Sequence, residues 1–261
     1  MNENQQNASG MKAITVSRQY GSGGGEIAAR LAHRLQWQLI DHEIVAEVAR
    51  ELGMSEEEAE VHDERSESFI SRLLGSMQLA SPELLANAPM IPLSPGTQEQ
   101  IYHDALQRVV ETAANTGNVV IVGRAGQVIL AKRRDVLHVR IVAPFEQRVR
   151  YVMQREGLDE ASARARVQQK DRDRAHNLQS QYHRDINDPL LYDLVVNSGV
   201  LDLESILDLT LLALERKGRR LAVKTSELGA VAGLTPYPGR PADLHLRPSE
   251  SASPSQNEQG T

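Results

Sequence analysis

The chain has 261 residues, 40% of them hydrophobic and 25% charged, a composition that allows one sizeable α/β domain or two smaller ones. The formal net charge of −6 argues against a general nucleic-acid binder, because no overall positive field is present to release counterions. The absence of cysteine excludes disulfides, thiolate zinc sites and cysteine nucleophiles. No apolar run approaches the roughly 20 residues that span a bilayer, and residues 1–10 lack the apolar stretch of a secretory signal. We therefore expect a cytoplasmic protein with neither nucleic acid nor membrane as a partner.

The first predicted elements are a strand and a helix. Residues 13–17 form a short β-branched run bounded by glycines, which predicts a buried strand. In residues 26–35 the apolar side chains fall at helical spacing. A second strand is expected over 37–41 and a second helix over 42–53.

The middle of the chain is less regular. Residues 54–67 are acidic and helical in composition, and four prolines interrupt 68–97, which we interpret as a mobile excursion. A helical period returns over 98–117. The run 118–123 is apolar throughout and predicts a central strand of a parallel sheet.

The second half repeats the alternation. Strands are expected over 136–143 and 192–198, an arginine-rich helical region over 145–183, and an amphipathic helix over 203–218. Strands that alternate with helices predict a three-layer α/β sandwich with a central parallel sheet. We expect this domain to cover 12–222, with disordered tails at 1–11 and 223–261.

A glycine-rich turn joins the first predicted strand to the first helix. It contains Gly21, Gly23, Gly24 and Gly25. Glycine allows the backbone to take positive φ and to approach a ligand closely, and a helix N-terminus that follows offers free N–H groups to phosphate. The turn predicts a nucleoside triphosphate site; the alternative is a flexible turn without a ligand.

The turn departs from the phosphate-loop pattern G-x-x-x-x-G-K-[ST]. In an alignment with this pattern, Arg18 occupies the position of the first glycine. Gly24 occupies the position of the lysine, and Gly25 that of the serine or threonine. The cation for the terminal phosphates and the hydroxyl for magnesium are therefore both missing. One hypothesis is that Arg18 covers the turn and supplies the charge; the alternative is that Arg18 pairs with Glu26 or another acid. Glu26 suits the helix dipole but would repel phosphate unless a metal or an arginine lies between them.

The sequence resembles the cytidylate-kinase-like branch of the phosphate-loop nucleoside monophosphate kinases. The resemblance covers about residues 12–215, and SRQYGSGGGEIA (17–28), VVIVGRAG (119–126) and YDLVVNSG (192–199) are its most specific parts. It implies a P-loop fold with an acceptor-side insertion at 54–100, a helical lid at 145–185, and use of ATP with Mg²⁺ to phosphorylate CMP or dCMP.

Position by position, the resemblance implies a set of site residues. The glycines of the turn, Ser22 and Glu26 would surround the donor phosphates, and Asp41 would lie near the acceptor. Arg124 matches the arginine of a G-R-D motif that grips the acceptor. The aspartate of that motif is Ala125 here, so a carboxylate that helps to read cytosine is absent.

The lid resemblance points to cations that act during transfer. We expect Lys170, Arg172 and Arg174 to act there, because charge spreads over the phosphoryl oxygens as the group moves. The alternative is a solvated, salt-bridged helix.

Three functions fit these observations. The first is ATP-dependent phosphorylation of a nucleoside monophosphate or a related small acceptor. The second is a catalytically weak or inactive nucleotide sensor, which the missing lysine, hydroxyl and aspartate favour. The third is a kinase for another small metabolite. The retained arginines and lid favour a kinase.

Overall fold

The computed structural model describes residues 10–41 and 95–228. The predicted helix at 42–53, the acidic segment at 54–67, most of the predicted excursion and most of both predicted tails lie outside the described residues. The chain divides into two units, one ending at Leu221 and one beginning at Ala222. In the second unit the described residues include a short 3₁₀ helix, η2, at Thr225–Glu227.

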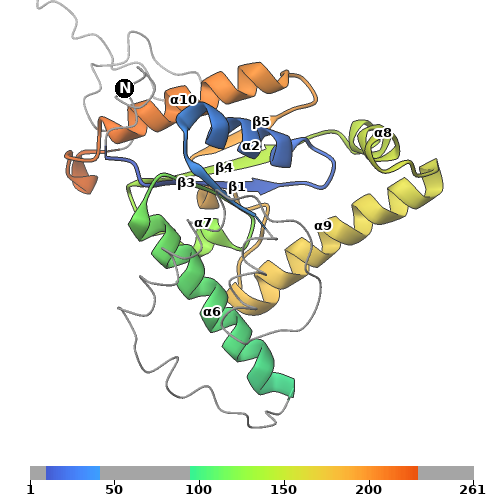
Figure 1. Cartoon of the computed structure of the whole chain (residues 1–261), viewed down its shortest axis with the longest axis horizontal. Coiled ribbons are helices and arrows are strands. Elements are labelled where there is room, and N and C mark those ends of the chain that lie inside the picture. The colour runs from blue at the N-terminus through green and yellow to red at the C-terminus, as the bar shows by residue number, and fades with distance from the viewer. Residues whose placement is uncertain (1–9, 42–94, 229–261) are drawn as a thin grey trace, which may run out of the picture. The chain divides into compact units, whose positions relative to one another are not determined.

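Five strands form one parallel sheet in the first unit, as predicted (Figure 1). Their order is β2-β3-β1-β4-β5. Their bounds are Ala13–Arg18 for β1, Gln38–Ile40 for β2, Val119–Val122 for β3, Val136–Val142 for β4 and Leu194–Asn197 for β5. β3 is an interior strand between β2 and β1, so its uniformly apolar sequence follows from burial on both faces.

Helices cover both faces of the sheet (Figure 1). α2 (Gly24–Leu35) and α10 (Leu203–Gly218) pack on one face, where Ile14 and Val16 of β1 join their core. α6 (Pro95–Thr116) and α7 (Gly126–Ile129) pack on the other, around Ala13 of β1. Because side chains alternate along a strand, β1 contributes to both cores. The predicted three-layer fold is confirmed.

The arginine-rich region consists of two helices, α8 (Phe145–Glu156) and α9 (Glu160–Tyr182). Gly157, at φ 65°, ends α8. Asp159 caps α9 by accepting a hydrogen bond from the Ser162 N–H at 2.9 Å. The helical region predicted over 145–183 is thus divided into two helices at Gly157. A short 3₁₀ helix, η1 (Pro189–Leu191), then leads to β5.

Two further details differ from the prediction. α6 begins at Pro95, three residues earlier than expected, as suits proline in the first turn of a helix. The four-residue helix α7 was not predicted. None of the described helices has the length and apolar character that crossing a membrane requires.

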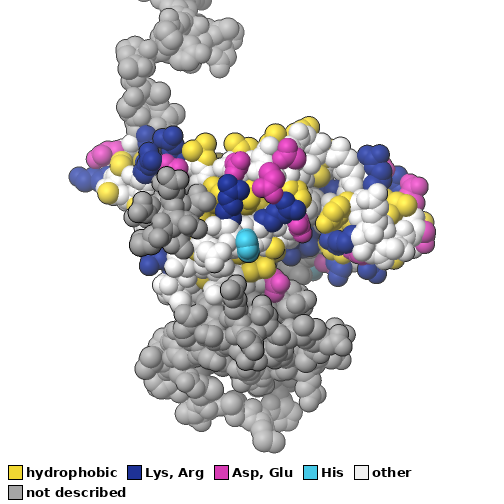
Figure 2. All heavy atoms as spheres, turned by 45° about the horizontal axis from the view of Figure 1, so that its top comes forward, with side chains coloured by type: hydrophobic (Ala, Val, Ile, Leu, Met, Phe, Trp, Pro, Cys, Tyr) yellow, Lys and Arg dark blue, Asp and Glu magenta, His cyan; other side chains and the backbone are white. Residues whose placement is uncertain are grey.

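Charged side chains on the α2 and α10 side of the sheet are paired. Figure 2 shows basic and acidic side chains next to one another there. Arg30 contacts both Glu26 and Glu204, and Arg34 lies 3.4 Å from Asp208. Such exposed pairs contribute little to stability.

Candidate functional site

The glycine turn follows β1 directly and is shaped by left-handed backbone. Gly21 and Gly23 have φ of 79° and 76°, values that side-chain-bearing residues rarely adopt. Gly23 caps α2, so the first N–H groups of that helix have no partner within it. The turn thus has the backbone form that phosphate binding needs.

Two neighbouring glycines in the first turn of α2 have different surroundings. A Cβ added to Gly24 would lie 2.5 Å from the Arg18 Cβ, so Gly24 is required for β1 to lie against the helix. A Cβ added to Gly25 would meet nothing within 4 Å. There is therefore open space beside Gly25 for a ligand.

Ser22 is used to build the turn. It is 3% exposed, and its hydroxyl donates to the Gln19 carbonyl at 2.9 Å. Its backbone N–H bonds to the same carbonyl at 3.3 Å. Ser22 therefore fixes the turn from inside.

A cavity of about 440 Å³ lies where β1 and β3 end. It is bounded by the ends of these strands, by α6, α7 and α9, and by Ile186. Four predicted site residues line it: Arg18, Arg124, Lys170 and Arg174. The structure thus brings together cations that are far apart in the sequence, at the edge where parallel α/β sheets bind ligands.

The guanidinium of Arg18 lies at the end of β3. A Cβ added to Gly123 would be 2.2 Å from Arg18 Nη1, so the side chain extends past the turn toward Arg124. Burial, together with the neighbouring Arg174 and Arg124, lowers the pKa of Arg18 to about 9, and Asp41 acts in the opposite direction. Glu26 pairs instead with Arg30 at 3.1 Å, so the expected alternative of an Arg18–Glu26 pair is not formed.

Arg124 is held by a strained turn. Gly123, Arg124 and Ala125 have φ of 74°, 53° and 53° in succession. Two side-chain-bearing residues in the left-handed region cost roughly 1 kcal/mol or more each, and such strain gathers at functional sites. The turn leads the chain from β3 into α7 and places Arg124 at the cavity.

The remaining predicted residues lie elsewhere. Arg172 is exposed, donates to Gln169 at 2.9 Å and lines a separate open groove beside Arg148. Glu26 is on the outer side of α2. Asp41 follows β2, close enough to influence the pKa of Arg18. The structure therefore separates Arg172 from Lys170 and Arg174.

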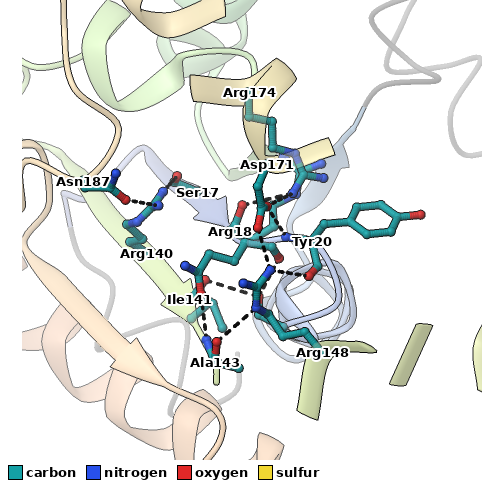
Figure 3. Close-up of polar contacts among 12 residues, drawn as sticks. Ser17, Arg18, Tyr20, Arg140, Ile141, Ala143, Arg148, Asp171, Arg174 and Asn187 are labelled. Carbon is teal, nitrogen blue, oxygen red and sulfur yellow. Dashed lines mark hydrogen bonds and ion pairs between the residues drawn. The ribbon is translucent and has the colours of Figure 1, made fainter. Parts of the chain in front are cut away.

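Side chains of α8 and α9 hold the backbone of the residues that lead into the glycine turn (Figure 3). The Tyr20 N–H donates to the Asp171 carboxylate at 2.8 Å, and the Tyr20 carbonyl accepts from Arg148 at 3.0 Å. Arg148 also pairs with Asp171, and Arg174 donates to the Arg18 carbonyl at 3.1 Å. We call Arg148, Asp171 and Arg174 the latch. A movement of α9 would therefore displace the backbone of the glycine turn.

Sequence reasoning missed one buried cation beside the cavity. Arg140 is 5% exposed, and it donates to Ser17 Oγ at 2.9 Å and to Asn187 at 3.1 Å (Figure 3). It has no carboxylate partner among the described residues. An arginine within a strand whose other residues are apolar except for His138 was the available signal, because charged residues are rarely buried without a role.

Comparison with known proteins identifies the family of the chain. The model of the cytidylate kinase-like family matches residues 13–200. A cytidylate kinase of Archaeoglobus fulgidus is 27% identical over 205 residues, which is 78% of this chain and 95% of that protein. A uronate isomerase of Corynebacterium glutamicum is 30% identical over 154 residues, 58% of this chain; the match spans only 29% of that protein.

Among solved structures, an uncharacterized protein from Eubacterium ventriosum superposes with a TM-score of 0.58 at 20% identity. The match covers 78% of this chain and 99% of that one, and it shows a shared fold. Because the family match extends from β1 through β5, the chain belongs to the cytidylate kinase-like family.

Proposed function

We propose that the protein transfers the γ-phosphoryl group of ATP to a nucleoside monophosphate, CMP-like or related, held in the cavity. The observation that carries the proposal is the gathering of Arg18, Arg124, Lys170 and Arg174 round one cavity beside a glycine turn. The similarity to a cytidylate kinase over 95% of that protein also supports the proposal.

The donor and the acceptor have separate places in this proposal. The free N–H groups at the start of α2 and the open space at Gly25 fit the phosphates of ATP. The cavity cations fit the acceptor phosphate and the group in transfer, because phosphoryl transfer needs positioning and charge stabilisation above all. Arg18 and Arg124 hold the acceptor, while Lys170 and Arg174 approach from α9.

In this proposal magnesium is held mainly by the phosphates of ATP. The described residues contain no group of three or more His, Asp or Glu side chains that could hold a metal ion by themselves. Asp41 is the carboxylate that we expect to assist. A bound Mg²⁺ would neutralise charge on the donor phosphates.

The test is acceptor-dependent release of ADP by purified protein with ATP and Mg²⁺, using CMP, dCMP, UMP, AMP and GMP. We expect turnover with at least one pyrimidine nucleotide, and a loss of roughly a hundredfold in Arg124→Ala because a charge contact is removed. The control is Arg134→Ala, a surface arginine that donates to the Arg220 carbonyl at 2.7 Å and does not line the cavity.

A second candidate is a nucleotide sensor without turnover. It is favoured by Gly24 and Gly25, which stand where a phosphate loop has its lysine and hydroxyl residue. ATP binding by calorimetry without release of ADP from any acceptor would select the sensor, or an acceptor outside the panel. Absence of both binding and turnover would contradict both functions.

A further inference from the structure

The cavity has two chemically different halves. Its cations on α9, Lys170 and Arg174, precede the neutral residues Asn177, Leu178 and Gln181. At about 1.5 Å of rise per residue, the lining from Lys170 to Gln181 extends about 16 Å along the helix. The charged and neutral parts of a ligand would therefore meet different parts of α9.

The neutral lining residues, which we call the neutral half, combine apolar side chains with carboxamides. Leu106, Leu178 and Ile186 supply the apolar surface, and Gln127, Asn177 and Gln181 supply the amides. The acids that line the cavity are limited, within the described part of the chain, to Asp173, which lies in the half that contains the cations. This half thus suits an uncharged ring with polar edges.

Gln127 is the buried member of the amide group. It is 3% exposed, yet it lines the cavity as the second residue of α7, just after the strained turn at Arg124. Its side chain has no hydrogen bond with any described residue. Because its amide opens onto the cavity and makes no hydrogen bond within the described protein, it is available to a ligand that supplies the partner.

We propose, on the basis of the function proposed above, that Gln127 reads the base edge of the acceptor nucleotide. A carboxamide offers a carbonyl oxygen and an NH₂ group, and rotation exchanges the two. It therefore accepts a base edge with an exocyclic amino group as well as one with an oxo group. A carboxylate, which only accepts hydrogen bonds, would require the amino group. The site thus admits both CMP and UMP.

The test compares kcat/KM for CMP and UMP in the wild type, in Gln127→Glu and in Gln127→Ala. We expect the two wild-type values to lie within about tenfold of each other, since one reversible amide contact discriminates weakly. Gln127→Glu should shift the ratio toward CMP by about tenfold or more, because its carboxylate repels the oxo group. Gln127→Ala should weaken both acceptors alike.

The matched control is Gln154→Glu, the same change at an exposed position on α8. It should leave the ratio unchanged. If Gln127→Glu does not fold, Gln127→Met, which keeps the volume without hydrogen bonds, should weaken both acceptors while leaving their ratio near that of the wild type. A wild-type preference for CMP of about a hundredfold, or a ratio unmoved in Gln127→Glu, overturns the inference.

The outcome also separates this inference from the proposed function. Turnover with an unmoved ratio rejects the role of Gln127 and keeps the kinase. If no acceptor is turned over, the kinase fails, and the dissociation constants of CMP and UMP measured by calorimetry provide the same comparison of variants. Absence of binding by both nucleotides rejects the inference as well.

Discussion

Gly24 and Gly25 are adjacent in the sequence, but the structure gives them different tasks. Gly24 allows β1 and α2 to approach, because its added Cβ would overlap the Arg18 Cβ. Gly25 faces open space and leaves room for phosphate. Sequence alone shows two equivalent glycines; packing and ligand access distinguish them.

This difference predicts opposite effects of alanine. Gly24→Ala should lower the free energy of unfolding by about 1–3 kcal/mol through overpacking. Gly25→Ala should leave it equal or raise it by up to about 1 kcal/mol, because alanine favours helix. ATP affinity should nevertheless fall in Gly25→Ala, because the new methyl enters the space for phosphate. Urea unfolding and calorimetry measure the two quantities. Unchanged ATP affinity in a folded Gly25→Ala would argue against this place for the phosphates.

The choice among the lid cations also shows where residue-level prediction ends. The resemblance to the kinase lid indicated Lys170, Arg172 and Arg174 alike. Successive residues of a helix point about 100° apart, so α9 directs Lys170 and Arg174 to the cavity and Arg172 to a separate groove. The rotation of α9 about its axis is fixed by its contacts with α8 and with Tyr20, which the sequence does not reveal.

At the scale of elements, the strands and the long helices could be predicted because their hydrophobic periods are clear. α10 was predicted at its observed bounds, Leu203–Gly218. α7 was missed because four residues are too few to show a period. The break between α8 and α9 could be predicted from Gly157, a residue typical of a helix end, and from Asp159, a residue typical of a helix start.

The latch joins two of these elements and can be tested by a double-mutant cycle. Asp171→Ala leaves Arg148, whose side chain is 7% exposed, without its acid. Since Asp171 itself is 28% exposed, we expect a loss of about 2 kcal/mol rather than the larger values found for fully buried pairs. Arg148→Met combined with Asp171→Ala should recover part of this loss, and the Tyr20 amide should exchange faster in Asp171→Ala.

The control for the latch is Glu160→Ala on the same helix. Glu160 is 63% exposed and pairs with Arg164 at 2.9 Å, so its removal should change stability by less than about 1 kcal/mol. Equal effects of Asp171→Ala and Glu160→Ala on both stability and Tyr20 exchange would show that the latch does not hold the turn.

At the scale of the molecule, the parallel sheet places the ends of β1 and β3 beside one another although more than a hundred residues separate them in the sequence. That topology followed from the alternation of strands and helices. The sequence suggested Arg124 and Arg174 through the resemblance to kinases and Arg18 through its place before the glycine turn, but no local pattern indicated that all three line one cavity. Arg140 could have been singled out as a cation within a largely apolar strand. Gln127 could not be predicted, because its significance lies in lining the cavity without a hydrogen-bond partner among the described residues.

The most direct measurement is a crystal structure with an analogue in which adenosine and a pyrimidine nucleoside are joined by a chain of phosphates. The account predicts the adenosine-side phosphates on the N–H groups of Gly24 and Gly25, and the pyrimidine edge within hydrogen-bond distance of Gln127. The linking phosphates should contact Arg18, Arg124 and Arg174. An analogue bound with its phosphates away from the glycine turn, or with the cavity empty of the pyrimidine, would contradict it.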